Sequence, residues 1–513
     1  MPVAVWGTAD AGEEATVTFA GQSKSATADA AGKWAVKLDA IETSAEPREL
    51  VVRGATSTLK IQDVLVGEVW LAGGQSNMGF GLSSAHNAAE ALAHADDGQL
   101  RLFKVPLKTA VEPQADTAGQ WAVSSAESAK GFSAVAWFFA RELRQTQKCP
   151  VGVIAAPWGG TPIETWIGLD AIRLDPPLTR LQEQWNKAME QHQKVLGDPK
   201  LAENYAAELK AWKKEVEPAF NAENRAYNTA KAAGKAVGPK PQPSRPEPTN
   251  PDPMGAPSPS KRPGVPAISF NAMIAPLAPY TLRGAIWYQG EANGSAGLEY
   301  RTLLPRLIQN WRAHWGSEFS FLFVQLPCNG PDKLPVAEAG WPWLREAQLM
   351  ALREPRTSMA VTIDVGNPND VHPNDKLDVG HRLALLARRD VYGEKIVAQG
   401  PLFRGSEVET NSIRVHFTDT GTGLTAAQAP WRAPGVEPLP TDRLIGFFIA
   451  GEDRNWVEAE AKIEGDAVVV SSANVPHPAA VRYGWANSPR CNLYNREGLP
   501  ASPFRTDAWD KPR

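Results

Sequence analysis

Polar and apolar residues alternate with a period close to two near the start of the chain. The alternation is clearest over 33–38, where the sequence reads KWAVKL, and shorter apolar runs occupy 3–6 and 15–20. A period of two places successive side chains on opposite faces of a strand, and Gly- and Asp-bearing turns separate these runs. The pattern predicts an N-terminal β-sandwich over residues 1–62.

From residue 63 the apolar residues form short continuous runs, which are typical of strands buried on both faces. Several runs end in Gly-bearing loops, and helix-compatible stretches such as 134–147 and 375–389 lie between them. This alternation predicts an α/β domain with a doubly wound parallel sheet over 63–392. The expected strands are 64–72, 151–156, 284–288, 321–326 and 359–363.

One segment, 177–266, interrupts the alternation. Its first part is rich in Ala, Glu, Gln, Lys and Leu, and Leu181, Trp185 and Met189 recur at helical spacing, so we expect a long helical hairpin. Eleven prolines between Pro239 and Pro266 favour extended backbone on the surface. Strand patterns then return and predict a C-terminal β region over 393–513.

Composition narrows the class of partner. Lys and Arg number 53 against 57 Asp and Glu, and a net charge of −4 is too weak to attract nucleic acid or an anionic membrane. Three cysteines make neither a disulfide framework nor a closely spaced metal motif. No apolar run approaches the roughly 18 residues that span a bilayer, and the opening MPVAVWG shows no signal peptide. A small or neutral partner fits best.

The first candidate for chemistry is the pentapeptide GQSNM at 74–78. It places Ser76 at the carboxyl end of a buried strand, where open α/β sheets bind ligands, and just before the helix-compatible stretch 85–95. That position suits a nucleophile, although a serine that caps a helix is an equal alternative. Met78 replaces the second glycine of the G-x-S-x-G elbow, which argues against an α/β-hydrolase.

Two further loops follow apolar strands. Gly159 and Gly160 permit close approach of the backbone to a ligand, and a free amide there suits an oxyanion, with a plain tight turn as the alternative. The loop at 287–293 gathers Gln289, Glu291 and Asn293, a cluster that is costly unless it is paired or functional. A hydrogen-bonded loop network is the alternative there.

His372 is the candidate base, because histidine titrates near neutral pH. Among eight histidines it alone lies in a predicted strand-to-helix loop with an aspartate, Asp370, two residues away. A carboxylate beside a histidine fixes its tautomer and stabilises the imidazolium. A histidine that is merely hydrogen-bonded within its loop is the alternative.

These loops together resemble the sialate O-acetylesterase group of SGNH hydrolases, which includes carbohydrate acetylesterases acting on plant polysaccharides. The resemblance spans nearly the whole chain apart from the predicted insertion. It rests on VWGTADAGEEATVTF from residue 5, GGQSNM at 73–78, WGGTPIETW at 158–166, FNAMIAPL at 270–277, GAIWYQGEAN at 284–293, DVHPNDKLDVGHRLA at 370–384, VRYGWANSP at 481–489 and NREGLPASPFRTD at 495–507.

The resemblance implies a flavodoxin-like, three-layer SGNH domain with Ser76 as nucleophile and His372 as general base. The implied oxyanion hole comprises the amides of Ser76 and of Gly159 or Gly160, with a side-chain amide from Gln289 in preference to Asn293. The wider group places its acid three residues before the histidine, where this chain has Asn369. The orienting acid is therefore open between Asp370, Asp364 and none. Further residues implied to contact substrate or support the site are Gln75, Asn77, Glu291, Asn293 and Trp158.

The activity implied is hydrolysis of acetyl esters on sugar hydroxyls through an acyl-serine, with no metal or organic cofactor. The expected partner is an acetylated sugar, oligosaccharide or polysaccharide, in a periplasmic or secreted setting. A sialate 9-O-acetylesterase is the leading expectation, and an acetylxylan or other plant-polysaccharide acetylesterase is the first alternative. A non-catalytic glycan-binding protein is the second.

Overall fold

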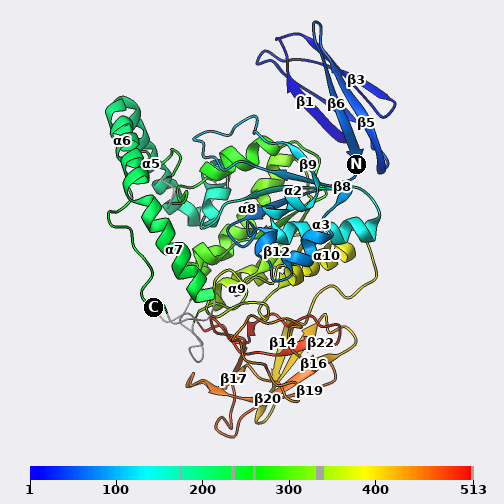
Figure 1. Ribbon diagram of the computed structural model, residues 1–513. Coiled ribbons are helices and arrows are strands. Elements are labelled where there is room, and N and C mark those ends of the chain that lie inside the picture. Colours follow the sequence, from blue (N-terminus) through cyan, green and yellow to red (C-terminus); the bar gives the residue numbers. More distant parts are fainter. Residues whose placement is uncertain (174–175, 233–236, 258–260, 331–339, 510–513) are drawn as a thin grey trace. The chain divides into compact units, whose positions relative to one another are not determined.

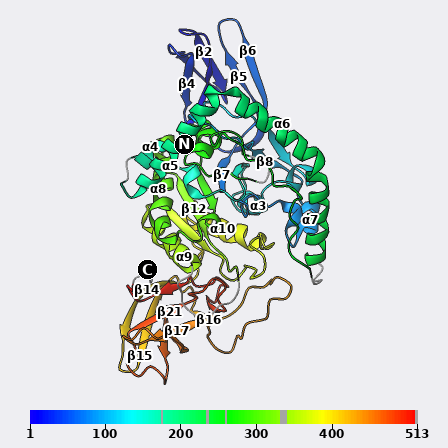
Figure 2. The ribbon, with the colours of Figure 1, turned by 90° about the vertical axis from the view of Figure 1, so that its left-hand side faces the viewer.

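The computed structural model describes residues 1–173, 176–232, 237–257, 261–330 and 340–509 (Figures 1 and 2). Residues 233–236 and 258–260 of the predicted insertion lie outside the described residues. The chain divides into two compact units. The first comprises Met1–Pro106, Thr117–Ile163 and Leu277–Arg513, and the second comprises Leu107–Asp116 and Glu164–Pro276.

The N-terminal strands form two antiparallel sheets, as the alternating pattern predicts. The sheets are β1-β4 and β3-β2-β5-β6, built from β1 (Val3–Thr8), β2 (Glu14–Phe19), β3 (Gln22–Thr27), β4 (Lys33–Leu38), β5 (Ser44–Arg53) and β6 (Thr58–Val66). Their shared core includes Val17, Trp34 and Leu38. The prediction that 64–66 begins the α/β domain is wrong, because Val64 and Val66 pair with β5.

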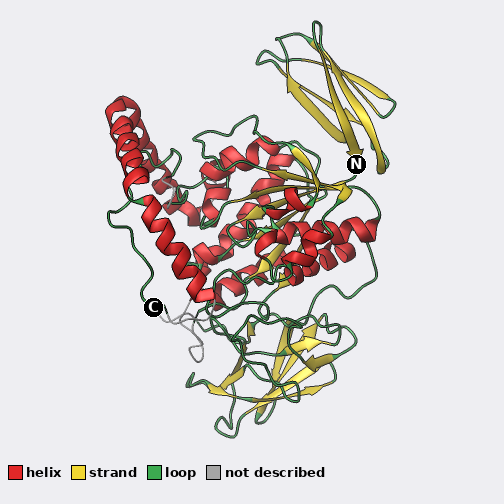
Figure 3. Cartoon of the chain, in the orientation of Figure 1, coloured by secondary structure: helices red, strands yellow, loops and turns green. Residues whose placement is uncertain are grey.

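The α/β domain is built on one seven-stranded sheet of order β13-β12-β11-β7-β10-β8-β9. Figure 3 shows its strands in yellow among the red helices. All neighbouring strands are parallel except β8 and β9. The strands are β7 (Glu68–Gly74), β8 (Asp97–Lys104), β9 (Trp121–Ser124), β10 (Val151–Pro157), β11 (Gly284–Tyr288), β12 (Ser320–Gln325) and β13 (Thr357–Val361). The predicted mainly parallel sheet is confirmed, and β8 and β9 are the strands that the apolar runs did not indicate.

Helices cover both faces of this sheet. Trp70 and Gly73 of β7 are an odd number of residues apart, so they face opposite sides; Trp70 contacts Phe139 of α3 (Ala134–Gln147), and Gly73 lies against Trp311 of α8 (Gly297–Trp315). The other helices of the domain are α1 (Ala88–Ala93), α2 (Ala126–Lys130), α9 (Gly340–Met350), which packs on α8, and α10 (Leu377–Asp390), which packs on α3.

The crossover direction of the chain reverses at β7. From β7 the chain builds β8, β9 and β10 on one side, then β11, β12 and β13 on the other. The loops that leave β7, β10 and β11 therefore meet at the carboxyl edge of adjacent strands, which is where open α/β sheets bind ligands.

The C-terminal residues form antiparallel sheets, as expected. The sheets are β14-β15-β20-β19, β18-β17-β21-β23 and β16-β22. Phe504 of the second sheet stacks on Phe403 of the first, with ring centroids 4.8 Å apart, and so joins the two sheets through their apolar faces. The strands are β14 (Leu402–Val408), β15 (Ser412–Thr418), β16 (Leu424–Ala426), β17 (Phe447–Ala450), β18 (Val457–Glu458), β19 (Glu460–Glu464), β20 (Ala467–Ser471), β21 (Ala480–Tyr483), β22 (Leu493–Asn495) and β23 (Phe504–Arg505).

The second unit contains α4 (Leu169–Arg173), α5 (Thr179–Gly197), α6 (Pro199–Glu215) and α7 (Glu217–Ala232). The predicted helical hairpin is wrong, since the segment after α4 folds as three helices. The break between α5 and α6 is local: the Asp198 side chain accepts a hydrogen bond from Lys200 N–H, and Pro199 occupies the first helical position. The described part of the proline-rich segment has neither helix nor strand, and its Met254 belongs to the same buried hydrophobic cluster as Trp185 of α5.

Candidate active site

The loop that carries Ser76 is fixed by backbone bonds to both neighbouring strands. Gln75 N–H donates to the Tyr288 carbonyl of β11 at 3.0 Å, and Trp158 N–H, just after β10, donates to the Gly74 carbonyl at 3.0 Å. Gly74 adopts φ +136°, and a Cβ there would lie 2.1 Å from the Tyr288 oxygen. Only glycine fits this position, so the sequence itself dictates where the strand turns and releases Ser76.

Ser76 and His372 meet at this edge. His372 Nε2 lies 2.8 Å from Ser76 Oγ, although 296 positions separate the two residues. Burial lowers the pKa of His372, the Asp370 charge raises it, and the Lys376 charge lowers it. The net direction is downward, so the imidazole is neutral at neutral pH and can accept the serine proton.

Asp370 caps the turn of the His372 loop. Its Oδ1 accepts a hydrogen bond from His372 N–H at 2.9 Å, whereas the distance from this oxygen to His372 Nδ1 is 3.8 Å. The side chain of Asp370 is 54% exposed. The contact with the ring is thus longer than a hydrogen bond, and solvent screens the charge.

Asp364, the alternative acid, is paired elsewhere. Arg382 of α10 donates to both of its carboxylate oxygens at 2.6 and 2.7 Å, and Tyr494 O–H donates to Oδ2 at 2.9 Å. The side chain of Asp364 is only 2% exposed. This buried ion pair joins the segment after β13 to α10 and to β22, which is a structural role.

The backbone after β10 lies directly against Ser76. A Cβ added to Gly159 would be 3.2 Å from Ser76 Cβ, and Gly160 adopts φ +74° in the turn that follows. Thr161 Oγ1 donates to the Trp158 carbonyl at 2.7 Å and closes this turn. The predicted pair of glycines therefore brings the backbone at Gly159 next to Ser76.

Gln289 is fully buried beneath the loops. Its Nε2 donates towards Gln75 Oε1 at 3.2 Å, the Thr161 carbonyl at 3.2 Å and Asn293 Oδ1 at 2.8 Å. Tyr300 O–H occupies its Oε1 at 2.8 Å. Two amide hydrogens already serve three acceptors, which argues against Gln289 as a direct oxyanion donor and favours a role in tying the loops together.

Hydrogen bonds to its side-chain oxygen fix the orientation of the Asn293 amide. Asn293 Oδ1 accepts hydrogen bonds from Gln289 Nε2 at 2.8 Å and from Ile163 N–H at 2.9 Å, so its Nδ2 points away from those two donors. Gln75 Oε1 also accepts from Ala292 N–H at 3.1 Å. The predicted cluster is therefore both a hydrogen-bond network and the scaffold of the site.

Lys376 is the site residue that the sequence argument did not assign a role. It is completely buried, and its Nζ donates to Asn77 Oδ1 at 2.6 Å. The same asparagine donates to Glu291 Oε1 at 2.5 Å. Lys376 directly precedes α10 and lies four residues after His372. This closeness to His372 in the sequence is the feature that could have pointed to Lys376 as a site residue.

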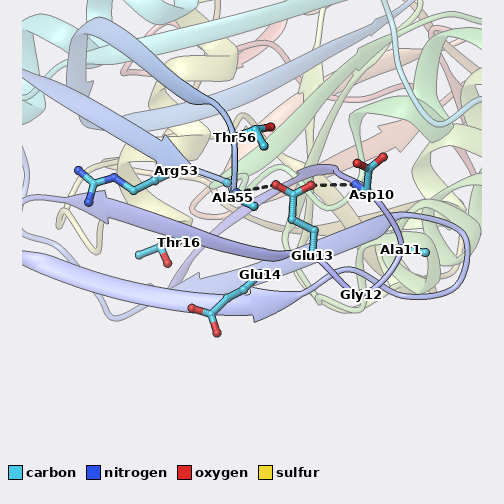
Figure 4. A pocket seen from close by; sticks show the side chains of 10 residues that line it. Asp10, Ala11, Gly12, Glu13, Glu14, Thr16, Arg53, Ala55 and Thr56 are labelled. Atoms are coloured by element: carbon cyan, nitrogen blue, oxygen red, sulfur yellow. Dashed lines mark hydrogen bonds between the residues drawn. The ribbon is translucent and has the colours of Figure 1, made fainter.

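A separate hollow lies in the N-terminal strands (Figure 4). Glu13 lines it and accepts hydrogen bonds from Asp10 N–H at 3.0 Å and Ala55 N–H at 2.7 Å, and these bonds lower the pKa of Glu13. The carboxylate thus braces two turns. The hollow is lined by Asp10, Ala11, Gly12, Glu13, Glu14, Thr16, Arg53, Gly54, Ala55 and Thr56.

No helix in the described part of the chain is long and apolar enough to cross a bilayer.

Comparison with known proteins identifies the class. The family model described as carbohydrate esterase, sialic acid-specific acetylesterase matches residues 66–224. Sialate O-acetylesterases of Rattus norvegicus and Homo sapiens are 29% and 28% identical over 98% of this chain and 90% and 88% of their own lengths. A carbohydrate acetylesterase of known structure from Xanthomonas citri is 34% identical with a TM-score of 0.75, covering 99% of this chain and 96% of that one.

The chain belongs to the sialate O-acetylesterase family of carbohydrate esterases. It is a carbohydrate O-acetylesterase, as the resemblance implied, and not the non-catalytic glycan-binding protein considered beside it. The family match runs to residue 224, so its range includes α5 and α6 of the predicted insertion.

Proposed function

We propose that Ser76 is the nucleophile and His372 the general base of acetyl ester hydrolysis. The observation that carries this assignment is the 2.8 Å contact between Ser76 Oγ and His372 Nε2 at the carboxyl edge of the sheet. A hydroxyl is a weak nucleophile until a base takes its proton, and a neutral imidazole within hydrogen-bond distance supplies that base.

The reaction then runs in two halves. Ser76 Oγ attacks the acetyl carbonyl carbon while His372 Nε2 takes the hydroxyl proton. The tetrahedral intermediate collapses, the bond to the sugar oxygen breaks, and His372 returns the proton to that oxygen. Water next attacks the carbonyl carbon of acetyl-Ser76 while His372 Nε2 takes one of its protons. The bond from that carbon to Ser76 Oγ then breaks, His372 returns the proton to Ser76 Oγ, and acetate leaves.

The developing oxyanion requires donors beside Ser76. We assign the Ser76 amide, an amide at Gly159 or Gly160, and a side-chain amide from the loop after β11, that of Asn293 or of Gln289. The position of Gly159 against Ser76 supports the backbone donor, and the hydrogen bond between Gln289 and Asn293 places both side-chain amides in one network. Loss of one such donor typically raises the barrier by about 3–4 kcal/mol.

We assign no aspartate as a hydrogen-bonded partner of the ring. Asp370 acts through its charge, which raises the pKa of His372, and through the turn that it caps. Asp364 is held by Arg382. The proposed machinery is thus a Ser-His dyad whose base is placed by its loop.

The proposed substrate is a 9-O-acetylated sialic acid, in line with the names of the mammalian relatives. Acetylated xylan or another plant polysaccharide is the second candidate, because the more similar Xanthomonas citri protein carries the broader name of carbohydrate acetylesterase. Both substrates present the same acetyl ester on a sugar hydroxyl.

Acetate release tests the proposal, with wild type and Ser76→Ala offered 9-O-acetylated sialic acid and acetylated xylan in parallel. Release by wild type but not by Ser76→Ala supports Ser76 as the nucleophile. The substrate that wild type hydrolyses faster decides between the two candidate substrates. Equal release by Ser76→Ala would reject Ser76 as nucleophile. The melting temperature of Ser76→Ala, expected to match wild type, shows that the fold is intact.

A further inference from the structure

Asn77, the residue after the proposed nucleophile, is held from three sides. Its side chain is fully buried; Nδ2 donates to Glu291 Oε1 at 2.5 Å and to the Val371 carbonyl at 2.9 Å, and Oδ1 accepts from Lys376 Nζ at 2.6 Å. Both amide hydrogens are therefore used. The three partners belong to the loop after β11, the His372 loop and the residue before α10.

The two charged partners lie at opposite ends of one amide. A cation at the amide oxygen and an anion at the amide nitrogen favour the same direction of the amide dipole. A flipped amide would turn its oxygen to the Glu291 carboxylate and its N–H groups to the Lys376 ammonium. The charges therefore select the orientation in which the second N–H meets the Val371 carbonyl.

The hydrogen bond from Asn77 Nδ2 to the Val371 carbonyl links the two halves of the proposed dyad, because Asn77 adjoins Ser76 and Val371 adjoins His372. Resting on that dyad, we propose that Lys376 and Glu291 are positioning residues. Through the Asn77 amide that they orient, they set the distance between Ser76 Oγ and His372 Nε2. Neither of them needs to touch the substrate for this role.

Burial makes it costly to keep both Lys376 and Glu291 charged. The Nζ of Lys376 lies 4.9 Å from the centroid of the Phe80 ring and 5.4 Å from the centroid of the Tyr288 ring. Burial lowers the pKa of Lys376 to about 7, against the raising effect of Glu291, Asp375 and Asp370, and burial raises the pKa of Glu291. Lys376 and Glu291 meet through Asn77, and buried charges add little net stability over apolar residues of similar size, so we assign them a positioning role.

The Lys376 charge also acts on the base. It lowers the pKa of His372, whereas Asp370 raises it. The low-pH limb of kcat/KM marks the protonation of His372, and Lys376 is charged in that range. Removal of the lysine charge therefore moves this limb to higher pH, which a lysine that only fills space would not do.

The test compares Lys376→Met with Lys395→Met, an exposed lysine beyond α10. Kinetics are measured as acetate release from the better substrate across pH. For Lys376→Met we expect a loss of about 10- to 100-fold in kcat through misplacement of the dyad, a KM close to wild type, and an upward shift of the low-pH limb. Lys395→Met should match wild type.

A double variant, Lys376→Met with Glu291→Gln, separates positioning from stability. It removes both charges and keeps an acceptor oxygen for Asn77, so the melting temperature lost in Lys376→Met should largely return. The kcat and the pH limb should stay altered, because neither charge orients the amide. This variant carries the test if Lys376→Met does not fold.

If the double variant regained the wild-type kcat and the wild-type low-pH limb along with its stability, the positioning role would be overturned. Wild-type kinetics in Lys376→Met would also overturn it. Failure of the dyad itself is recognised separately, since Ser76→Ala would then keep releasing acetate. Inactive Ser76→Ala beside unaffected Lys376→Met rejects only the positioning role.

Discussion

Asp370 and His372 are joined through the backbone rather than through the imidazole. Asp370 Oδ1 lies 2.9 Å from His372 N and 3.8 Å from His372 Nδ1. An asparagine retains a side-chain oxygen for the backbone bond and loses only the charge. The Asp370 position thus separates the geometric contribution of the side chain from its electrostatic contribution.

Asp370→Asn should therefore keep kcat within about fivefold of wild type, since an exposed charge contributes about 1 kcal/mol or less. Its negative charge raises the pKa of His372, so its removal lowers that pKa. The low-pH limb of kcat/KM should move to lower pH. A loss of 100-fold or more would instead make Asp370 the orienting acid.

Wild-type activity should persist below the ordinary histidine pKa of about 6.5. Burial, the largest influence, lowers the pKa of His372, so the neutral, proton-accepting form survives to lower pH. The measurement is kcat/KM for acetate release between pH 4 and pH 9, corrected for any unfolding at each pH. A limb at or above 6.5 would contradict the direction inferred from burial.

Asp364→Asn should act on stability. It leaves Arg382, whose side chain is 5% exposed, without its bidentate partner, and breaking a buried pair costs about 3–5 kcal/mol. Urea unfolding measures the loss. Asp39→Asn is the control, because Asp39 pairs with Lys24 while 78% exposed and should cost about 1 kcal/mol or less. Lost activity at unchanged stability would restore Asp364 as a candidate acid.

Gly159→Ala should lower kcat, because its new Cβ would lie 3.2 Å from Ser76 Cβ and displace Ser76, the proposed nucleophile, or the turn. A displacement near 1 Å costs on the order of 100-fold in rate. Gly98→Ala is the matched control: no atom lies within 4 Å of the added Cβ. Wild-type kcat in Gly159→Ala would show that this backbone has room to move.

The sequence was most informative where one local pattern decides the structure. Continuous apolar runs ending in glycine located β7, β10 and β11, and these strands carry three of the predicted loops. β8 was missed because only Leu100 and Leu102 are buried among its eight residues. The break before Pro199 was missed because helical periodicity continues through the segment on either side of it.

Residues whose role depends on distant partners were harder to assign. His372 could be selected by elimination and by its neighbouring aspartate, but the spacing of Asp370 does not reveal that its oxygen turns to the backbone. Lys376 and Asn77 lie 299 positions apart. A lysine before a helix is usually solvated, and only the folded loops show that this one is buried.

Asn293 and Gln289 can be distinguished by which kinetic constant each controls. If Asn293 Nδ2 serves the oxyanion, Asn293→Ala should lower kcat by about 100- to 1,000-fold with KM little changed. Gln289→Ala should chiefly lower the melting temperature, because it removes one hydrogen bond each from the buried Gln75 and Tyr300, at about 1 kcal/mol for each lost bond. Steady-state kinetics and thermal unfolding of both variants decide the assignment. The reverse pattern, with kcat lost in a stable Gln289→Ala, would return the donor role to Gln289.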